Sequence, residues 1–481
     1  MKKIYKLMIT ILSLMIILVG CSDSSEIKLD PKNPVIITLA TYYNDKQLND
    51  LNEMIRNFNE NEGSEKGIIV ELISSGSVFE TNKILLDSAN DAPGSIEFPN
   101  IFITYKGLIM ELEGKKEVID YRDYFSEEEL GQYLENLIST GKFEADQEKI
   151  SMLPMANSTI ITFINKTDFD EIAQKIGVNY DMLDTYEGIM EVAEKYYQYT
   201  DSLTPEPHDG KALYGMDAIV SQILAIHKST GQDILTKTDG KVEVNFQKDF
   251  AKKMWDTFYV PTMKGYFAKY GKFTSEDMKT GKILVSSAST AGAGYYPSKI
   301  LLEDGQEKNI EIITRFAPTI KGHDGLSVQQ GGGIFISKST PNKEYAAAEF
   351  VKWMTNRENN TMFTLRSSYI PVRVDNTSIE DIKQTITENN INEIVTASLV
   401  TSIDQIKTRK PYISPNIQGY EDVRSIVESV FAHEMNDARE TLLDEVSQGK
   451  DYDQAVAEAI SEESFELWYQ DTLSRLQQAI Q

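Results

Sequence analysis

VIITLATYYNDKQLNDLNEMIRNF, residues 35–58, is the stretch that decides the fold class of this chain. It begins with a continuous apolar run, VIITLA, which is typical of a parallel strand that is covered on both faces. Apolar residues then recur at the spacing of one helical face, at Leu48, Leu51, Ile55 and Phe58. A buried strand followed by an amphipathic helix opens an α/β unit, so the stretch predicts an α/β fold.

The same alternation continues along the chain. IIVELI (68–73) and NIFITY (100–105) are predicted strands, and the segment between them is helical. We expect these strands to form an open parallel sheet. STIITFIN (158–165) predicts a further strand, after which the pattern is mostly helical to about residue 259, with one hairpin signal at Asp239 and Gly240. Three more strand candidates follow, in KILVSS, IEIITRFAP and GGGIFISKS, and from residue 379 the pattern is helical and charged.

Composition limits the classes of protein that the chain can be. Its 481 residues suffice for two or three domains, because single cores stop growing at roughly 250–300 residues. The formal net charge of −26 argues against nucleic acid as a partner, since such binding needs a clustered basic surface. The acidity is typical of a solvated protein surface.

The first twenty residues differ from the rest. A basic start, MKKIYK, precedes a 13-residue apolar run, which is too short for an ordinary membrane span and typical of a secretory signal. Leu18, Val19, Gly20 and Cys21 resemble the lipobox of bacterial lipoproteins, in which cleavage before the cysteine leaves that residue lipidated. We therefore expect a signal peptide at 1–20, a lipid such as palmitate on Cys21, and a tether over 22–34. The protein would lie on the extracytoplasmic face of the cell membrane, as on Gram-positive-type cell surfaces. Cys21 is the only cysteine, which excludes an intramolecular disulfide.

Motifs for enzyme chemistry are weak. The four histidines lie far apart in sequence, and HEMND at His433 lacks the second histidine of a zinc-protease helix. The chain has no GxSxG elbow and no Walker loop, and AGAGYYP lacks the third glycine of a dinucleotide fingerprint and places Pro297 where the helix should run. We predict that the protein is not an enzyme and uses no metal or cofactor.

Small polar and aromatic residues gather at the ends of predicted strands. Ligands of open α/β sheets bind outside the carboxyl ends of the strands, so this distribution predicts a cleft. The residues concerned are Thr41, Tyr42 and Tyr43, the serines of 74–77, Thr104 and Tyr105, and Asn157 and Ser158.

KILVSSASTAGAGYY (282–296) has three possible interpretations: a linker, a phosphate cradle or a solute-binding loop. The missing third glycine weakens the cradle, and the strand before it weakens the linker. We interpret it as a strand end that delivers Ser287, Ser289 and Thr290 to the cleft, with Tyr295 behind. Its hydroxyls fit phosphate oxygens and sugar hydroxyls equally well.

Four segments carry a resemblance to a known family. They are SMLPMANSTIITFINKTDF (151–169), GKFTSEDMKTGKILVSSAS (271–289), VQQGGGIFISKSTPNKEYAAAEFVKWM (328–354) and SSYIPVR (367–373). In this order they resemble the extracellular solute-binding proteins (family 1) of bacterial ABC importers, which include maltose and glycerol-3-phosphate binders. The resemblance implies a two-lobed, periplasmic-binding-protein-like α/β fold with a cleft between the lobes and a helical C-terminal region.

The resemblance also implies lobe boundaries and ligand contacts. Lobe 1 would comprise 35–153 and 309–368, and lobe 2 would comprise 154–308 and 369–481, with hinge crossings near Pro154, Asn309 and Tyr369. The resemblance implies ligand contacts from Ser74, Ser158, Ser289, Gly331, Tyr369 and Arg424, and the positions of Tyr42, Lys106 and Thr290 add these three to the expected ligand-binding residues.

Several of these positions have open alternatives. Arg424 either binds a phosphate through its planar fork or forms a solvated ion pair on a helix. Lys106 stands where glycerol-3-phosphate binders have a glutamate, so the ligand carries a further acceptor or the lysine points to solvent. Tyrosines such as Tyr42, Tyr295 and Tyr369 either stack on a sugar ring or pack internally.

The function expected from these features is capture of a solute for an ABC importer. A monomeric lipoprotein would bind a carbohydrate or a glycerophosphoester in its cleft, close around it, and deliver it to a membrane permease. The alternative is a surface interaction lipoprotein, an adhesin or scaffold, that keeps the fold without transport.

Overall fold

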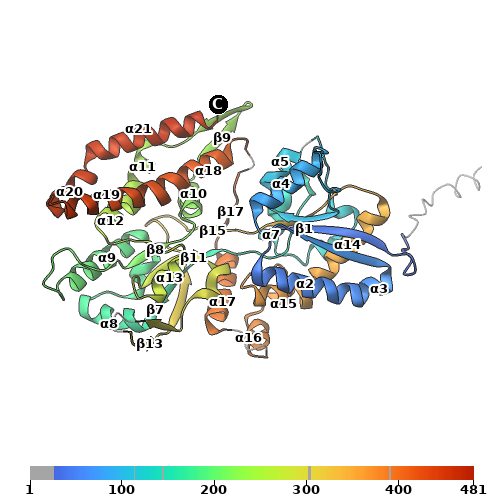
Figure 1. The fold of residues 1–481 in the computed structure, drawn as a ribbon, viewed down its shortest axis with the longest axis horizontal. Coiled ribbons are helices and arrows are strands. Elements are labelled where there is room, and N and C mark those ends of the chain that lie inside the picture. Colours follow the sequence, from blue (N-terminus) through green and yellow to red (C-terminus); the bar gives the residue numbers. More distant parts are fainter. Residues whose placement is uncertain are drawn as a thin grey trace, which may run out of the picture.

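The computed structural model describes residues 27–112, 114–143, 146–301, 305–388, 392–415 and 417–480. The chain forms two lobes that lie side by side along the long axis of the molecule, each built around its own sheet (Figure 1). The predicted α/β class is confirmed. The signal peptide and the lipidated Cys21 lie outside the described residues. Within the described ranges, every helix is too short or too polar to cross a membrane.

The first lobe contains a five-stranded sheet. Its strands, in spatial order, are β2 (Ile68–Ser74), β1 (Val35–Thr41), β3 (Ile101–Thr104), β16 (Gly333–Ile336) and β6 (Leu153–Pro154). β1 is parallel to β2 and β3, as the apolar run predicts. The expected parallel pairing of these three strands is confirmed, and β16, which is antiparallel to both of its neighbours, makes the whole sheet mixed. β16 enters the sheet from the second lobe and starts beside Thr104, where β3 ends, so it must run in the opposite direction.

Helices cover both faces of this sheet. They are α2 (Asp45–Glu60), α3 (Glu62–Lys66), α4 (Val78–Ala89), α5 (Gly107–Leu112), α6 (Glu127–Leu130), α7 (Glu135–Ile138), α14 (Pro341–Met354) and α15 (Arg357–Arg366). Leu51, Ile55 and Phe58 of the predicted helical stripe are buried in the core. The ring of Phe58 meets that of Phe350 edge-on at 4.9 Å. The stripe therefore joins the start of the chain to a helix that follows the second lobe in sequence.

The second lobe contains a four-stranded sheet. Its strands, in spatial order, are β14 (Ile312–Phe316), β7 (Ile160–Asn165), β11 (Val285–Ser289) and β8 (Tyr214–Met216). β7 is antiparallel to β14 and β11, and β11 is parallel to β8. β14 therefore belongs to the second lobe, and the crossing expected near Asn309 lies further on, between β14 and β16. Pairing with the fully buried β7 fixes β14 in this lobe.

The remaining elements of the second lobe surround this sheet. Those before the last crossing are α8 (Lys166–Ile176), α9 (Tyr186–Asp201), α10 (Ile219–Ser229), α11 (Lys248–Met254), a π-helix (Trp255–Tyr259), α12 (Val260–Met263) and α13 (Thr274–Lys279). The predicted hairpin is confirmed as β9 (Leu235–Thr238) and β10 (Lys241–Val244), with positive φ at Asp239 and Gly240. α16 (Ile379–Glu388) follows the last crossing, and α17 (Glu393–Thr408) packs on β14.

The helical C-terminal region completes the second lobe. It consists of α18 (Tyr420–Glu428), a π-helix (Ser429–Glu434), α19 (Met435–Ser447), α20 (Tyr452–Ala459) and α21 (Glu462–Gln478). Figure 1 shows α18 and α21 side by side, with the near end of α18 directed toward the first lobe. Phe431 and Phe465 bury their rings in the same core as Trp255. This region is therefore part of the second lobe and not a separate unit.

Three chain segments cross between the lobes and are hydrogen-bonded to one another. The N–H of Ser158 donates to the carbonyl of Gln330 at 2.7 Å, and the N–H of Gln330 donates to the carbonyl of Ser158 at 2.9 Å. The N–H of Ile370 donates to the carbonyl of Asn157 at 2.7 Å. Nearby, β15 (Ser327–Val328) pairs with β17 (Pro411–Tyr412). We call 155–159, 328–332 and 367–373 the hinge.

Two buried amides hold the hinge from opposite sides. In the first lobe, Asn360 donates to the carbonyl of Met155 at 2.7 Å and accepts from the N–H of Val372 at 3.1 Å. In the second lobe, Gln405 donates to the carbonyl of Ile160 at 2.9 Å and accepts from the N–H of Ala317 at 2.7 Å. Because each amide contacts two segments distant in sequence, the ends of the hinge are fixed to their lobes.

Candidate functional site

The first lobe presents a group of tyrosines where its parallel strands end. Tyr42 and Tyr43 follow β1, and Tyr105 follows β3. The carboxyl ends of parallel strands share one edge of the sheet, which brings these rings together. Tyr42 stacks on Tyr105 with ring centroids 5.8 Å apart and meets Tyr43 edge-on at 5.0 Å. The three rings and Tyr369 of the hinge form one aromatic wall.

The phenols of this wall are neutral at physiological pH. Burial raises the pKa of Tyr42 well above its ordinary value of 10.0, and the neighbouring phenols Tyr43, Tyr105 and Tyr369 raise it further. Burial likewise raises the pKa of Tyr43 and of Tyr369. Neutral phenols combine an apolar ring face with a hydroxyl that can donate and accept, which suits a sugar ring or a glycerol unit.

Two glycines allow the hinge to pass close to this wall. The hydroxyl of Tyr42 accepts from the N–H of Gly332 at 3.1 Å. A Cβ on Gly332 would lie 2.8 Å from the Tyr42 ring, and one on Gly331 would lie 2.6 Å from the carbonyl oxygen of Ala156. Gly331 also has φ of +149°, which favours glycine. The close approach of two hinge segments thus accounts for Gly331, and its predicted contact with a ligand stays a prediction.

The second lobe brings a positive charge to the same place. Arg424 lies on α18, and its guanidinium is 3.5 Å from the carboxylate of Glu428. Burial raises the pKa of Tyr105, and the Tyr42 hydroxyl and the positive charge of Arg424 oppose that rise, so the two lobes interact electrostatically here. A Cβ on Gly107, the first residue of α5, would lie 3.8 Å from the carboxylate of Glu421.

We call this meeting point the interlobe junction. It comprises Tyr42, Tyr105, Gly107, Tyr369, Glu421 and Arg424. The ion pair proposed as the alternative for Arg424 is present, but it is long, and the side chain of Arg424 is 34% exposed. A pair of this kind contributes little to stability, so the guanidinium is available to a ligand at small cost.

The serine-rich strand end differs from expectation. β11 ends at Ser289, whose hydroxyl caps the 3₁₀ turn Thr290–Tyr295 by accepting from the N–H of Ala291. Ser287 is buried and accepts from the Tyr214 hydroxyl at 2.7 Å. Thr290 is 0% exposed, and its hydroxyl accepts from the N–H of Thr159 at 3.2 Å. Both hydroxyls are thus hydrogen-bonded within the second lobe, and the expected contact of Ser287 and Thr290 with a ligand stays a prediction. Tyr295 is 75% exposed and does not lie behind the serines.

The other predicted residues have mixed placements. Ser74, the last residue of β2, is exposed, and its hydroxyl donates to the carbonyl of Tyr43 at 2.9 Å. Ser158 is buried in the hinge, where its hydroxyl donates to the carbonyl of Gln330 at 3.3 Å. Lys106 is half-buried between Tyr105 and α5. Their roles in binding stay predictions.

Gln329 is a hinge residue that sequence reasoning did not single out. Both its amide oxygen and its amide nitrogen are buried without a hydrogen-bond partner in the described part of the chain. An unsatisfied buried polar group costs about 1–3 kcal/mol, so this amide gains from any rearrangement that provides a partner. The sequence feature that could have drawn attention to Gln329 is its place in QQGGG, shortly before three glycines. Across the described ranges, no three acidic, histidine or cysteine side chains form a cluster that could hold a metal ion.

Comparison with known proteins agrees with this architecture. Among the solved structures that resemble the chain is the cyclic α-maltosyl-1,6-maltose binding protein of Arthrobacter globiformis, with 15% identity, a TM-score of 0.65, and coverage of 93% of this chain and 98% of that chain. A family 1 extracellular solute-binding protein of Alicyclobacillus acidocaldarius has 12% identity, a TM-score of 0.63, and coverage of 93% of this chain and 100% of that chain. UgpB of Mycobacterium tuberculosis in complex with glycerophosphocholine has 15% identity, a TM-score of 0.59, and coverage of 92% of this chain and 99% of that chain.

At these identities the likeness shows the fold alone. The search of curated proteins found no match. The family described as bacterial extracellular solute-binding protein matches residues 53–388, which is more than half of the chain. The two lobes, the three-segment hinge and this match agree, and the chain is a member of the bacterial extracellular solute-binding protein family.

Proposed function

We infer that this protein is the substrate-binding lipoprotein of an ABC importer. It captures a carbohydrate or a glycerophosphoester at the interlobe junction and delivers it to a membrane permease. The family membership and the lobed fold support solute binding. The observation that carries the proposal is the meeting of the aromatic wall of one lobe with Arg424 of the other, beside a hinge of three segments.

Binding between the lobes couples capture to closure. A solute that contacts both Tyr42 and Arg424 is held fully only when the two lobes are close, because these residues belong to different lobes. Such a ligand shifts the population toward the closed form by its differential affinity for that form. The permease would then recognise the surface that closure creates.

The chemistry of the junction limits the class of solute. The neutral phenols favour a sugar ring or glycerol unit, and Arg424 favours an anionic group such as a phosphate. The solved neighbours are described as binding a cyclic maltosyl saccharide and glycerophosphocholine, which span the same two classes. Ser74, Lys106, Ser158, Ser289 and Thr290 remain proposed contributors.

A lipid on Cys21 would hold the protein at the extracytoplasmic face of the membrane. The segment proposed as the tether, 22–34, would link the lipid to the first lobe, and its Leu29 packs against the core of that lobe. Two or more acyl chains are needed for stable anchoring, because one chain alone binds a membrane only marginally. Mass spectrometry of the membrane-extracted protein tests this part of the proposal, with Cys21→Ser as the control that cannot be lipidated.

A panel of solutes in a thermal-shift assay tests the proposal. The panel contains maltotriose, a cyclic maltosyl saccharide, glycerol 3-phosphate and glycerophosphocholine. A solute present at a hundredfold over its dissociation constant stabilises the protein by about 2.7 kcal/mol and raises its melting temperature. Tyr42→Ala should abolish the shift, while Leu467→Ala, at an exposed position on α21, should leave it unchanged.

The same panel separates transport from the adhesin or scaffold alternative. A scaffold that has lost its binding chemistry would give no saturable response to any small solute. Absence of every shift, together with identical melting curves for the wild type and a Tyr42→Ala or Arg424→Ala variant in the presence of solute, would reject the importer assignment.

A further inference from the structure

A cavity of about 370 Å³ lies in the second lobe, apart from the aromatic wall. Its walls come from the end of β8 and the start of α10, from the segment Phe267–Lys272, and from the π-helix between α18 and α19 with the start of α19. Phe267, Phe431 and Met216 give it an apolar side, and Lys269, Lys272 and Asn436 give it a polar side. The volume falls within the range of small-molecule sites and exceeds what a lone small ion requires.

Two unusual backbone segments border the cavity. Ala218 has φ of +51°, a left-handed conformation that costs a residue with a Cβ about 1–2 kcal/mol. The opposite wall is the π-helix Ser429–Glu434, which supplies Phe431, Ala432 and His433 to the lining. Strained backbone and single π-helical turns occur preferentially at functional sites. Both features therefore favour a ligand here over incomplete packing.

The charges of the cavity are unevenly compensated. The ammonium of Lys269 lies 2.8 Å from the carboxylate of Asp217, which also accepts from the Thr274 hydroxyl at 2.8 Å. Glu428, on the opposite wall, forms only the long, partly exposed ion pair with Arg424. Lys272 forms no ion pair with any residue of the described ranges, and its ammonium lies 5.3 Å from the centre of the Phe273 ring. An exposed lysine without a carboxylate partner is notable in a chain of net charge −26.

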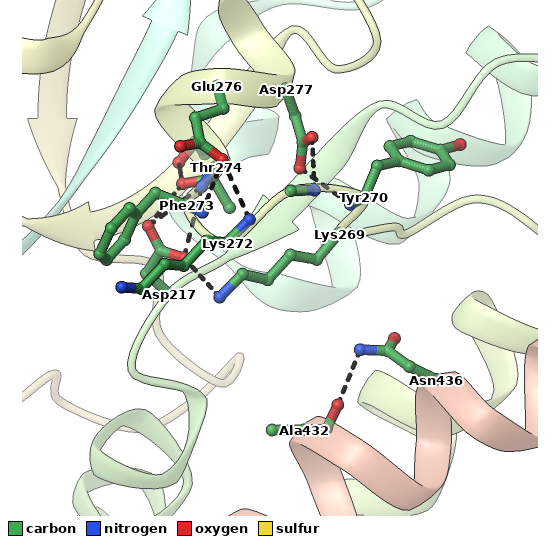
Figure 2. A network of polar contacts seen from close by, with 12 residues as sticks. Asp217, Lys269, Tyr270, Lys272, Phe273, Thr274, Glu276, Asp277, Ala432 and Asn436 are labelled. Atoms are coloured by element: carbon green, nitrogen blue, oxygen red, sulfur yellow. Dashed lines mark hydrogen bonds and ion pairs between the residues drawn. The ribbon is translucent and has the colours of Figure 1, made fainter.

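Figure 2 shows how these groups face the cavity. Lys269 reaches the carboxylate of Asp217, the N–H of Lys272 donates to the carboxylate of Glu276, and Asn436 lies on a separate helix. The amide of Asn436 donates to the carbonyl of Ala432 at 2.7 Å, which fixes its position. A ligand in this space would therefore meet the ammonium of Lys272 and the Lys269–Asp217 ion pair on one wall, and an oriented amide on the other.

The cavity adjoins the interlobe junction through two elements. Arg424 of the junction and Glu428 of the cavity wall are one turn apart on α18. Ser221, in the first turn of α10, accepts from the side-chain amide of Gln330 in the hinge at 3.3 Å. A solute longer than one sugar unit could contact the junction at one end and the cavity at the other.

We propose that this cavity is a subsite for an oxyanion, a carboxylate or a phosphate, carried on a saccharide or glycerol body, with Lys272 as the cation that binds it. The proposal rests on the proposed function and specifies its substrate class as an acidic, extended solute. The apolar side of the cavity receives the body, and Lys272 gains a charge-assisted hydrogen bond that the protein itself does not provide.

Lysine-resolved NMR tests the proposal directly. The lysines of the purified protein are reductively methylated with ¹³C, and the Lys272 resonance is assigned by its loss in Lys272→Gln. Glucuronate, glucose 1-phosphate and glucose are then titrated separately, which distinguishes a carboxylate from a phosphate and both from a neutral sugar. We expect the Lys272 resonance to shift with one or both acids and to stay unchanged with glucose.

Substitution gives the corresponding change in affinity. Lys272→Gln should raise the dissociation constant of the responding acid by about 10- to 100-fold, the range for a hydrogen bond to a charged group. Lys282→Gln is the matched control, because Lys282 is an exposed lysine that lies over the Tyr270 ring and does not line the cavity. Lys272 is exposed, so its substitution should leave the melting temperature of the free protein unchanged.

The outcomes separate this subsite from the proposed function. If the Lys272 resonance does not shift with either acid, or shifts equally with glucose, the subsite is overturned. Equal losses of affinity in Lys272→Gln and Lys282→Gln overturn it as well. A neutral saccharide that binds tightly in the thermal-shift panel while Lys272 stays silent would overturn the subsite and keep the proposed function. An acid that shifts Lys272 with an affinity unaffected by Tyr42→Ala would keep the subsite and reject binding at the interlobe junction.

Discussion

The two lobes reach the interlobe junction with different chemistry. The first lobe presents stacked phenols whose pKa values are raised by burial, and they are fixed by contacts within the lobe and with the hinge. The second lobe presents Arg424, half-exposed and weakly paired, with Lys269 and Lys272 in the adjoining cavity. The first lobe therefore presents neutral side chains in fixed positions, and the second lobe presents charged side chains that are partly exposed to solvent.

This difference suggests a division of labour in binding. Rigid aromatic faces lose little conformational entropy on binding, so they suit the part of a solute that all members of a class share. Charged side chains at an exposed edge add specificity and on-rate, because their interactions depend on the sign of the ligand. The first lobe should then set the affinity for the body of the solute, and the second lobe should choose between neutral and anionic solutes.

The largest expected effect comes from removing the aromatic face. Tyr42→Ala deletes a ring that stacks on Tyr105 and a hydroxyl that accepts from Gly332. We expect the free energy of unfolding to fall by about 2–3 kcal/mol in denaturant titration, since large-to-small changes of packed aromatic residues cost this much or more. Tyr42→Phe keeps the ring and should lose only about 1 kcal/mol. Equal losses in both variants would mean that the hydroxyl, and not the ring, organises the wall.

The next effect concerns the charged face. Arg424→Ala should weaken binding of glycerophosphocholine by at least about tenfold in calorimetry and leave maltotriose unchanged, because only the anion depends on the guanidinium. The melting temperature of the free protein should hardly change, since exposed ion pairs contribute about 0–1 kcal/mol. A similar loss for both solutes would contradict the division between the two faces.

A smaller effect is expected from pH. Below pH 10 the phenols of the wall are neutral in both the folded and the unfolded chain, so stability does not depend on them. Above pH 10 the unfolded phenols ionise, whereas Tyr42, Tyr43, Tyr105 and Tyr369, whose pKa values are raised by burial, stay neutral in the folded protein. Stability should therefore be lost as the pH rises above 10 toward the folded pKa values.

Urea titrations between pH 8 and 11 measure this loss. The loss should be smaller in a Tyr42→Phe, Tyr105→Phe double variant, because two of the ionisable groups are gone. An unchanged pH dependence in that variant would place the titrating groups elsewhere in the chain.

The smallest effect belongs to the exposed end of β2. Ser74→Ala removes a hydrogen bond from the serine hydroxyl to the carbonyl of Tyr43, at an exposed position. We expect a stability change of at most about 0.5–1 kcal/mol in the same denaturant titration. A large loss of solute affinity without a loss of stability would instead identify Ser74 as a direct ligand contact, as the resemblance to the family implies.

The strands and helices with strong apolar periodicity could be predicted from the sequence. VIITLA became β1, and the stripe Leu51, Ile55 and Phe58 is buried against the sheet. The hairpin at Asp239 and Gly240 was predicted because its turn requires positive φ, a local property. Membership of the solute-binding family followed from four motif segments.

The direction and placement of single strands could not be predicted in the same way. An apolar run does not indicate which strand it will pair with. The antiparallel direction of β16 and the place of β14 in the second lobe therefore could not be predicted from the pattern. The surroundings of the hydroxyls in KILVSSASTAGAGYY could not be predicted for the same reason. Ser287 is buried in β11, which is an interior strand, and strand order is set by pairing across the whole chain.

The sequence by itself determined the α/β class, the family and the tyrosines at the strand ends, because these depend on local periodicity and on contiguous motifs. Only the tertiary structure decided which side chains meet. Arg424 lies more than 300 residues from Tyr105, and the Lys272 cavity is closed by a helix from the end of the chain. Contacts of this kind depend on how two sheets and a three-segment hinge are packed, which no local pattern records.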